Sequence, residues 1–512
     1  MKSKMKKTRR AIGFHIVTFV VLAFTTSFCI LSRWFLRTFT VDIAEIIFTI
    51  KTPLKGAGFI FDSLFSFRLL AQFLAVLVAY ILFALACEFI FGNVDARVDI
   101  AIKKKNKRLS LEIYKIVKIS VVTLLVFCNV FYAVEDWKEL KIYEYLNSKK
   151  ERSTVFEEHY VEPDVSLVMG EGKNIIYIYL ESMETSYASK DAGGAQEVNY
   201  IPRLTQLAQA NVSFTTKAKK GVGGFRPATN SVHTFSALLG TSSGVPFKFP
   251  FYVNHLNKFT DGALSSLVTL GDILAQKGYT NEFLCGSDGD FAGRKQFFEQ
   301  NGGYRVFDYY SAIEEGYIAP DYRVWWGLED EILYRIAKDE ITRLAKTEKS
   351  FNFTMLTVDT HFVGGYRCAI CKDDYAEPFA NIVACADSQV ADFVAWIQVQ
   401  DFYENTVIVI SGDHPYMGNE VVGVIPSSER TVYDCFINSA AEVKGSETGR
   451  ECNTLDMFPT VLAAMGFSIE GERLGLGTNL FSEKKTLSEE LGYDELNAEL
   501  GKYSEFYEKR FY

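Results

Sequence analysis

The hydrophobic positions divide the chain into an apolar front end and a polar remainder. Three apolar runs cover residues 11–32, 68–91 and 116–134, and roughly 20 apolar residues suffice to cross a bilayer. After residue 171, short apolar runs of strand length alternate with stretches of helical periodicity and glycine turns. This alternation is typical of βαβ units. It predicts an α/β domain with a mainly parallel sheet and helices on both faces.

Basic residues give the apolar front end a direction. Six Lys or Arg residues occur in segment 1–10, and a second basic cluster lies within 93–115. With three transmembrane helices, both basic segments fall on the same side of the membrane, which the positive-inside rule makes the cytoplasmic side. We therefore predict a multi-pass protein of the cell membrane whose chain after residue 135 is extracellular or periplasmic.

These patterns divide the chain into four segments. We expect a membrane anchor over 1–134, an interfacial helix and linker over 135–170, a catalytic domain over 171–484, and a charged C-terminal tail over 485–512 that is a surface helix or partly disordered. The formal net charge of −9 argues against nucleic acid as a partner.

Three strand-like runs each lead into side chains that can bind a metal. The runs begin at residues 174, 353 and 406, and they lead into Glu181, Asp359, His361, Asp413 and His414. Ligands of open parallel sheets bind at the carboxyl ends of the strands, so these side chains are expected to share one edge. A single acidic strand end commonly marks only the entry to a loop. Three such ends, with histidine twice, favour a divalent metal site.

A segment crowded with hydroxyls, residues 226–246, lies between the first and second of these strands. From Thr234 the pattern predicts a helix that ends at Gly240. A hydroxyl at a helix N-terminus is commonly an N-cap, but a helix N-terminus also binds phosphate, and the helix dipole and a metal both favour the alkoxide of a nucleophile. Spacing alone does not choose among Thr229, Ser231, Thr234 and Ser236.

The chain has nine cysteines. Cys368 and Cys371 form a C-x-x-C pair, but no second pair occurs at zinc-finger spacing, so spacing predicts no zinc site. An outside location permits disulfides. We expect one pair among Cys368, Cys371 and Cys385. Cys435 and Cys452 are candidates for a further pair, and Cys285 either pairs with a third cysteine or is a buried free thiol; connectivity stays open.

Several motifs together resemble one family. They are Tyr-Leu-Glu-Ser182, Thr234 with Gly244-Val-Pro246, Val-Asp-Thr-His361, Ser-Gly-Asp-His414, residues 454–460 and residues 473–480. This set resembles the membrane-anchored phosphoglycerol transferases, which include the lipoteichoic acid synthases, within the alkaline phosphatase and sulfatase superfamily. The resemblance covers residues 170–482.

The resemblance implies a set of site residues. It implies that one divalent ion, usually Mn²⁺ in that family, is held by Glu181, Thr234, Asp413 and His414. It further implies that Thr234 is the nucleophile and that Arg294 and His361 hold the phosphate and glycerol of the substrate. Hard oxygen ligands with one histidine also suit Mg²⁺, and Zn²⁺ stays open as well.

The implied reaction has two steps. Thr234 attacks the phosphorus of phosphatidylglycerol, diacylglycerol leaves, and an acceptor hydroxyl on a cell-envelope glycan or a glycerol-phosphate polymer then takes the glycerol phosphate. Arg294 is a candidate for bidentate phosphate binding, with a surface ion pair as the alternative. His361 is a candidate proton donor, with a strand-end cap as the alternative, and Asp359 is expected to be a structural partner.

The chain departs from the lipoteichoic acid synthases at one pocket position. Those enzymes have a tryptophan two residues before the arginine, where this chain has Ala292. The three-span anchor is also shorter than their five-span form. The alternative function is a phosphoethanolamine transferase, which likewise uses a threonine, a metal and a lipid donor.

Two other functions are disfavoured. A sulfatase would need a Cys/Ser-x-Pro-x-Arg run, which the sequence lacks. A degenerate binding protein would be expected to lack one of the four core residues, all of which are present.

Overall fold

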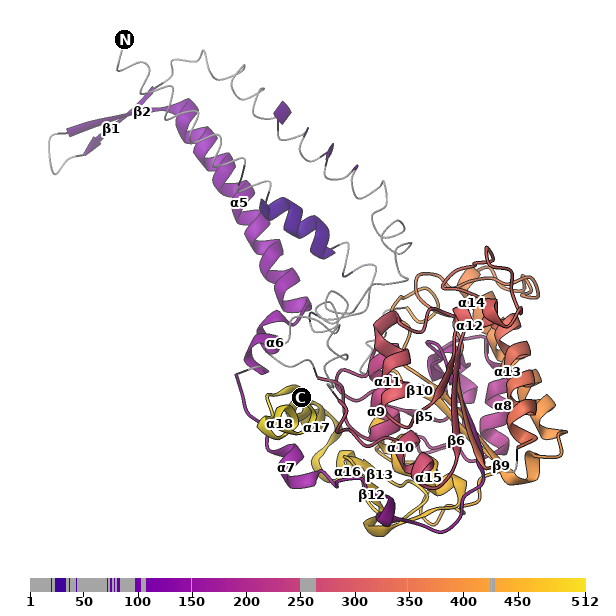
Figure 1. The fold of residues 1–512 in the computed structure, drawn as a ribbon. Helices are drawn as coiled ribbons and strands as arrows, with labels where there is room; N and C mark the ends of the chain where they lie inside the picture. Colours follow the sequence, from indigo (N-terminus) through magenta and orange to yellow (C-terminus); the bar gives the residue numbers. More distant parts are fainter. Residues whose placement is uncertain are drawn as a thin grey trace. The chain divides into compact units, whose positions relative to one another are not determined.

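The computed structural model describes residues 97–102, 107–148, 150–248, 264–347, 349–423, 425 and 429–512, together with residues 24–33 and single positions 20, 36, 43, 71, 74, 75, 78, 81 and 82 (Figure 1). The chain forms two compact units. One comprises Met1–Asp42 with Gly58–Tyr143, and the other Ile43–Ala57 with Glu144–Tyr512.

The described part of the first unit centres on a long helix, α5 (Ile113–Glu139), which contains the predicted span 116–134. Strands β1 (Arg97–Ile102) and β2 (Lys107–Glu112) form an antiparallel hairpin where the sequence predicted only a basic loop. The predicted span 68–91 and much of 11–32 lie outside the described residues. Within the part of the chain that the structure describes, no helix combines the length and apolarity needed to span a bilayer. The three-span anchor therefore stays a prediction.

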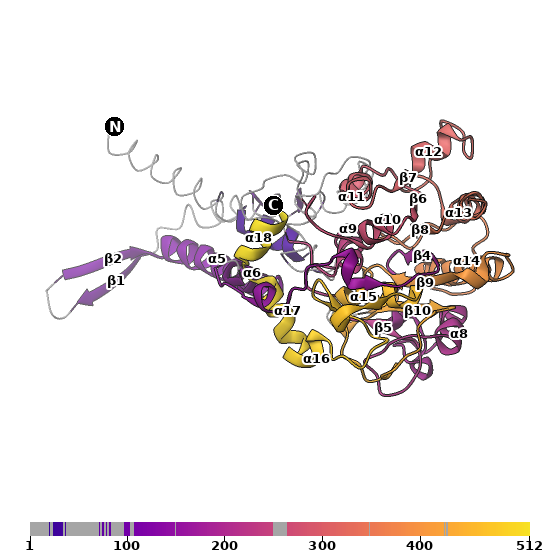
Figure 2. The same ribbon diagram turned by 60° about the horizontal axis from the view of Figure 1, so that its bottom comes forward.

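The second unit is built on a seven-stranded sheet with the order β5-β10-β9-β4-β8-β6-β7 (Figure 2). Strands β9, β4, β8, β6 and β7 are parallel, and β10 and β5 add an antiparallel edge. The bounds are β4 Asn174–Leu180, β5 Gly224–Phe225, β6 Thr280–Cys285, β7 Arg305–Phe307, β8 Phe351–Leu356, β9 Thr406–Gly412 and β10 Val432–Ile437. The predicted mainly parallel α/β sheet is confirmed.

The three strands that lead into the candidate site residues are neighbours. Strand β4 lies at the centre with all seven residues buried, as its continuous apolar run predicts for an inner parallel strand. It pairs with β8 on one side and β9 on the other, and Tyr179 lies level with both Leu356 and Ser411. The carboxyl ends of the three strands therefore end at the same level of one edge.

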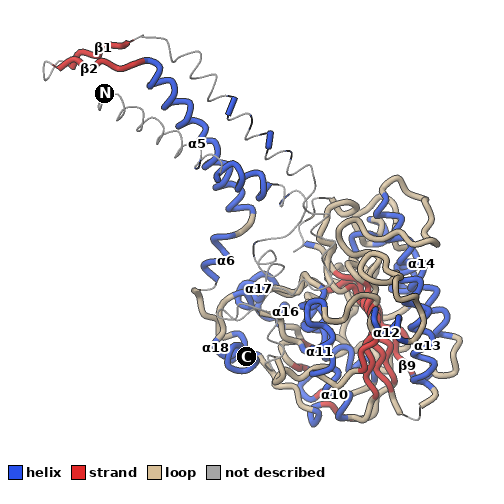
Figure 3. The backbone as a smooth tube through the Cα atoms, turned by 45° about the horizontal axis from the view of Figure 1, so that its top comes forward, coloured by secondary structure: helices blue, strands red, loops and turns tan. Residues whose placement is uncertain are grey.

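Helices cover both faces of the sheet (Figures 1 and 3). One face carries α9 (Thr234–Ser243), α10 (Leu270–Gln276), α11 (Arg294–Gln300) and α15 (Met457–Met465), and the other carries α8 (Pro202–Ala210), α13 (Asp330–Ala345) and α14 (Pro378–Gln398). Further described elements are α6 Ile142–Ser148, α12 Tyr309–Glu314 and the paired short strands β3 Val168–Met169 with β11 Ser468–Ile469 and β12 Arg473–Leu474 with β13 Gly477–Thr478.

The charged C-terminal segment is more ordered than its composition indicated. It forms α16 (Leu487–Leu491), α17 (Tyr493–Gly501) and α18 (Glu505–Phe511). Apolar residues spaced four apart form one buried stripe on each of the last two helices, and they are Leu496, Leu500, Tyr507 and Phe511. Both helices contact α7 (Val155–His159), so this segment packs on the same hydrophobic core as the sheet.

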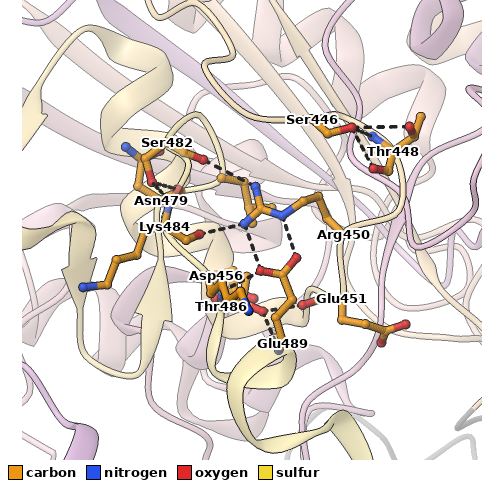
Figure 4. A network of polar contacts seen from close by, with 12 residues as sticks. Ser446, Thr448, Arg450, Glu451, Asp456, Asn479, Ser482, Lys484, Thr486 and Glu489 are labelled. Carbon is orange, nitrogen blue, oxygen red and sulfur yellow. Dashed lines mark hydrogen bonds and ion pairs between the residues drawn. The ribbon is translucent and has the colours of Figure 1, made fainter.

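Arg450 fastens the start of this segment to the domain (Figure 4). Its Nε donates to Glu489 Oε1 at 2.7 Å, and its Nη2 donates to Glu489 Oε2 at 3.3 Å and to the backbone carbonyl of Lys484 at 2.8 Å. The Arg450 side chain is only 9% exposed. Removing one partner of a buried ion pair lowers the free energy of unfolding much more than removing one partner of a surface pair.

We predict that Arg450→Met lowers the free energy of unfolding by about 3 kcal/mol, because Glu489 keeps its charge without a cationic partner. The matched control is Arg152→Met, which breaks an exposed pair with Glu505 at 3.5 Å. Denaturant unfolding of both variants measures the difference. Equal losses in the two variants would show that the buried pair has no special role.

All eight cysteines that the structure describes are free thiols. The predicted disulfides, Cys435–Cys452 and one pair among Cys368, Cys371 and Cys385, are therefore not formed.

Candidate active site

Four side chains from three elements meet at the carboxyl edge of the sheet. The hydroxyl Oγ1 of Thr234 donates to Glu181 Oε2 at 3.2 Å and lies 3.3 Å from His414 Nε2. The same nitrogen lies 3.4 Å from Glu181 Oε1 and 3.4 Å from Asp413 Oδ2. Glu181 comes directly after β4, Asp413 and His414 come directly after β9, and Thr234 is the first residue of α9. The structure thus brings together the four residues that the resemblance grouped as metal ligands.

The backbone around the acids is shaped for this convergence. Ser182 adopts a left-handed conformation with φ 51°, which is costly for a residue with a side chain and is found most often at functional sites. Its N–H donates to Asp413 Oδ1 at 2.7 Å, as does the N–H of His414. Gly412 permits the close approach of β9, because a Cβ there would lie 1.8 Å from the Met183 carbonyl oxygen. The glycine of Ser-Gly-Asp-His is therefore required by packing.

The donor set fits a divalent cation. Asp413 Oδ2 is buried and has no hydrogen-bond partner among the described residues. His414 Nδ1 lies 2.9 Å from the Pro415 carbonyl oxygen, so Nδ1–H donates there and Nε2 faces the carboxylates. One ligand atom each from Glu181, Asp413 and His414 lies within 4.8 Å of the others. A buried carboxylate oxygen without a hydrogen-bond partner, close to an imidazole nitrogen, is the arrangement expected of metal ligands.

The charges of this cluster are strongly coupled. Burial, and then the charge of Glu181, raise the pKa of Asp413 to about 7. Burial alone would lower the pKa of His414, but the neighbouring Asp413 and Glu181 carboxylates raise it to about 10. For Glu181, burial by itself would raise the pKa, but the charges of His361 and His414 lower it to about 2. A bound cation would take the place of the proton that Nε2 otherwise carries.

Among the four candidate hydroxyls, Thr234 is the one that reaches the acids. Thr229 donates through Oγ1 to the Asn497 carbonyl at 2.8 Å, and Ser236 donates to the His233 carbonyl at 2.9 Å. Ser231 Oγ is buried without a partner among the described residues. Thr234 itself is half-buried. The predicted helix start is confirmed, but the helix continues past Gly240 to Ser243 and ends at Gly244, whose φ of 67° suits a C-cap.

Asp359 lies at the same edge but outside the cluster. Its Oδ1 accepts from the Asp330 N–H at 3.2 Å, and Asp330 Oδ2 accepts from the Asp359 N–H at 3.1 Å. Burial, and then the charge of Asp330, raise the pKa of Asp359 to about 10, which keeps this carboxyl protonated. The pair fixes the end of β8 to the start of α13, so Asp359 has a structural position. Thr360 Oγ1 donates to the Glu181 carbonyl and ties the same loop to β4.

His361 and Arg294 follow the next strands along the sheet: His361 comes after β8, and Arg294 begins α11 after β6. The Nδ1 of His361 hydrogen-bonds to the Phe362 carbonyl, and the pKa of His361 is lowered, chiefly by burial, with the charge of Arg294 among the other causes. Arg294 is 5% exposed, which excludes the surface ion pair. Its Nη2 donates to Ser287 Oγ at 2.8 Å and to the Asp288 carbonyl at 3.0 Å.

Trp326 is a residue of the site to which no sequence motif pointed. Its ring centroid lies 4.5 Å from that of His361 and 5.0 Å from that of Phe291, and Phe291 lies 5.5 Å from the Arg294 guanidinium. An aromatic wall therefore joins His361 to Arg294, although position 292 is alanine. The available signal was a Trp-Trp-Gly run at 325–327 in a polar loop, but only the fold places it beside His361.

Comparisons with known proteins identify the family. The profile described as Sulfatase matches residues 173–467, more than half of the 512 residues. The chain therefore belongs to the sulfatase family, within the alkaline phosphatase superfamily. Membership of this family defines the fold of the domain. It does not by itself imply hydrolysis of sulfate esters, because the Cys/Ser-x-Pro-x-Arg run is absent from the sequence.

Two curated proteins and one solved structure illustrate what the chain is similar to. Phosphoglycerol transferase I of Xanthomonas axonopodis pv. citri is 29% identical over 297 residues, 57% of this chain and 40% of that protein. The Citrobacter koseri protein of the same name is 28% identical over 341 residues, 64% of this chain and 41% of that protein. The match thus spans about two fifths of the length of these curated relatives. The lipoteichoic acid synthase LtaP from Listeria monocytogenes superposes with a TM-score of 0.47 at 17% identity, over 64% of this chain and 80% of that chain.

Proposed function

We propose that this protein transfers glycerol phosphate from phosphatidylglycerol to a cell-envelope acceptor through a covalent Thr234 intermediate. The observation that carries the proposal is the contact of Thr234 Oγ1 with Glu181 and His414, beside the orphaned Asp413 oxygen. The relatives named phosphoglycerol transferase I support the choice of substrate.

The first step forms the intermediate. Thr234 Oγ1 bonds to the phosphorus of the lipid, the bond from phosphorus to the diacylglycerol oxygen breaks, and glycerophospho-threonine and diacylglycerol result. A divalent cation, Mn²⁺ in the first instance and otherwise Mg²⁺ or Zn²⁺, would be held by Glu181, Asp413, His414 and the Thr234 oxygen. When bound, it supplies charge neutralisation of the phosphoryl oxygens and a lower pKa for the hydroxyl.

His361 handles the proton in both steps. Because Nδ1 is committed to the Phe362 carbonyl, Nε2 is the nitrogen that faces substrate. In the first step the Thr234 hydroxyl loses its proton to water, and the protonated imidazole gives its Nε2 proton to the departing diacylglycerol oxygen. In the second step the neutral imidazole takes the proton of the acceptor hydroxyl, whose oxygen bonds to phosphorus. The bond from phosphorus to Thr234 Oγ1 breaks, and the threonine oxygen regains a proton from water. The lowered pKa of His361 favours the neutral form that the second step needs, and the first step draws on the minor protonated form.

Arg294 and the aromatic wall hold the headgroup. Arg294 begins α11, so its guanidinium and the helix N-terminus supply positive potential for a phosphate. Its contacts with Ser287 and Asp288 fix the guanidinium before substrate arrives. The glycerol part of the donor lies against Trp326 and hydrogen-bonds to His361.

A membrane location belongs to the same proposal. The apolar segments 11–32, 68–91 and 116–134 anchor the chain, with the catalytic unit on the extracellular or periplasmic side. Tethering beside the outer leaflet raises the local concentration of a lipid donor. The acceptor is a cell-envelope glycan or a polyglycerol phosphate.

A donor comparison tests the proposal against phosphoethanolamine transfer. The full chain in detergent is incubated with Mn²⁺ and either phosphatidylglycerol or phosphatidylethanolamine, and its intact mass and peptide map are then measured. One glycerophosphoryl group on the Thr234 peptide is expected with phosphatidylglycerol only. An adduct formed only with phosphatidylethanolamine would replace the proposal by the alternative. Metal-bound protein that forms neither adduct would contradict both.

Trp326 offers a sharper test of the headgroup pocket. We predict that Trp326→Ala lowers the transfer rate by about tenfold or more, because the imidazole of His361 loses the ring that holds it in place. Trp326→Phe should recover much of the rate, since it restores an aromatic face. Trp396→Ala, on the far end of α14, is the control. Separate kcat and KM values measure the effect, and an unchanged kcat in Trp326→Ala would remove the residue from the mechanism.

A further inference from the structure

Three cysteines gather at a second place in the domain. Cys368 and Cys371 lie in the loop after β8, and Cys385 lies on α14. The Cys368 sulfur is 3.2 Å from that of Cys371 and 3.8 Å from that of Cys385, and all three sulfurs lie within 4.8 Å of one another. The three residues are 4%, 8% and 8% exposed, so the cluster is buried.

The spacing of the sulfurs is close to that of a tetrahedral cation site. Zinc–sulfur bonds of about 2.3 Å at tetrahedral angles separate neighbouring sulfurs by about 3.8 Å. The Cys368–Cys385 distance of 3.8 Å equals this value, and the Cys368–Cys371 distance of 3.2 Å would widen slightly around an ion. A turn in which the Cys371 N–H donates to the Cys368 carbonyl at 3.2 Å brings the two cysteines of the C-x-x-C pair to one side. Cys385 completes the set from the facing helix. No second C-x-x-C pair is needed, because the helix provides the third ligand directly.

A fourth ligand position is also provided. Gln389 lies one helical turn after Cys385, and its side-chain amide nitrogen is 3.5 Å from the Cys385 sulfur and 3.9 Å from the Cys368 sulfur. Because the amide nitrogen and oxygen can be exchanged by a flip, its oxygen can face the same point. Arg367 donates to the Cys371 carbonyl at 3.5 Å and pairs with Asp373 at 3.2 Å, which links both ends of this part of the loop.

We propose that Cys368, Cys371 and Cys385, with the Gln389 amide or a water as fourth ligand, bind a structural Zn²⁺ ion outside the catalytic cluster. This ion joins the loop that carries His361 to α14. The first part of this loop folds back on itself, since the Tyr366 N–H donates to the Asp359 carbonyl at 2.7 Å. A catalytic consequence of this link for His361 rests on the proposed function, whereas the zinc site itself does not.

Cobalt substitution tests the site, because the catalytic ligands Glu181, Thr234, Asp413 and His414 include no sulfur. The full chain is purified in detergent under reducing conditions, stripped with a chelator, and titrated with Co²⁺. We expect an intense thiolate-to-cobalt charge-transfer band with a stoichiometry of one ion per chain. The band should be lost in Cys371→Ser and Cys385→Ser and kept in Thr234→Ala and in Cys285→Ala, which removes a buried thiol on β6.

Alkylation of the wild-type protein, which does not depend on any variant folding, gives a second measurement. We expect the peptides containing the three cysteines to resist alkylation as isolated and to react fully after chelation, with bound zinc measured by elemental analysis. A disulfide between any two of the three in non-reduced protein would overturn the proposal. So would free reaction of all three thiols before chelation, or a cobalt spectrum without a charge-transfer band.

Discussion

Thr234→Ala should reduce glycerol phosphate transfer from phosphatidylglycerol by roughly 10⁴-fold or more. Removing the nucleophile alone lowers kcat about as much as removing all the catalytic residues that act with it. The hydroxyl is the only group that Thr234 contributes to the cluster, through its 3.2 Å contact with Glu181 and its 3.3 Å contact with His414. Removing it leaves the helix and its neighbours in place. The variant should form no glycerophosphoryl adduct by intact mass spectrometry.

Two variants make this result specific. Ser236→Ala removes a hydroxyl from the same turn of α9, but that hydroxyl donates to the His233 carbonyl at 2.9 Å and points away from the acids. It should transfer near the wild-type rate. Thr234→Ser keeps the nucleophilic oxygen and should keep measurable turnover. Turnover or adduct formation by Thr234→Ala would assign the nucleophile elsewhere.

Asp413→Asn should weaken Mn²⁺ binding by at least about 100-fold and reduce transfer accordingly. The substitution preserves shape, and an asparagine oxygen can still accept from the Ser182 and His414 N–H groups, as Asp413 Oδ1 does at 2.7 Å. The substitution removes the negative charge on Oδ2, the atom that has no hydrogen-bond partner among the described residues. Calorimetric titration with Mn²⁺ measures the change, and thiolates compete poorly for this ion.

Asp434→Asn is the matched control for this prediction. Asp434 is a buried carboxylate on β10, the strand next to β9, and its Oδ2 accepts from the Phe214 N–H at 2.9 Å. Its replacement should lower stability while leaving Mn²⁺ affinity unchanged. Wild-type Mn²⁺ affinity in Asp413→Asn, or an equal loss in Asp434→Asn, would show that the orphaned oxygen is not a ligand.

Local sequence was enough to identify the central strands and the acidic residues at their ends. A fully apolar run is the property of an inner parallel strand, so Asn174–Leu180 and Thr406–Gly412 could be recognised locally, and their parallel pairing makes Glu181 and Asp413 meet. The start of α9 at Thr234 was likewise local. Its end was not, because Gly240 is tolerated inside a helix whose every later residue is buried.

Packing in three dimensions settled the features that depend on side chains distant in sequence. It selected Thr234 from four hydroxyls, because only the packing of α9 against the sheet determines which one reaches the acids. It placed Trp326 beside His361. The sequence had indicated no aromatic group in this pocket, because Ala292 stands two residues before Arg294. It gathered Cys385 with the C-x-x-C pair, and it buried the charged C-terminal helices. Local patterns specify elements; contacts between elements arise from the mutual fit of many segments, which no single stretch of sequence encodes.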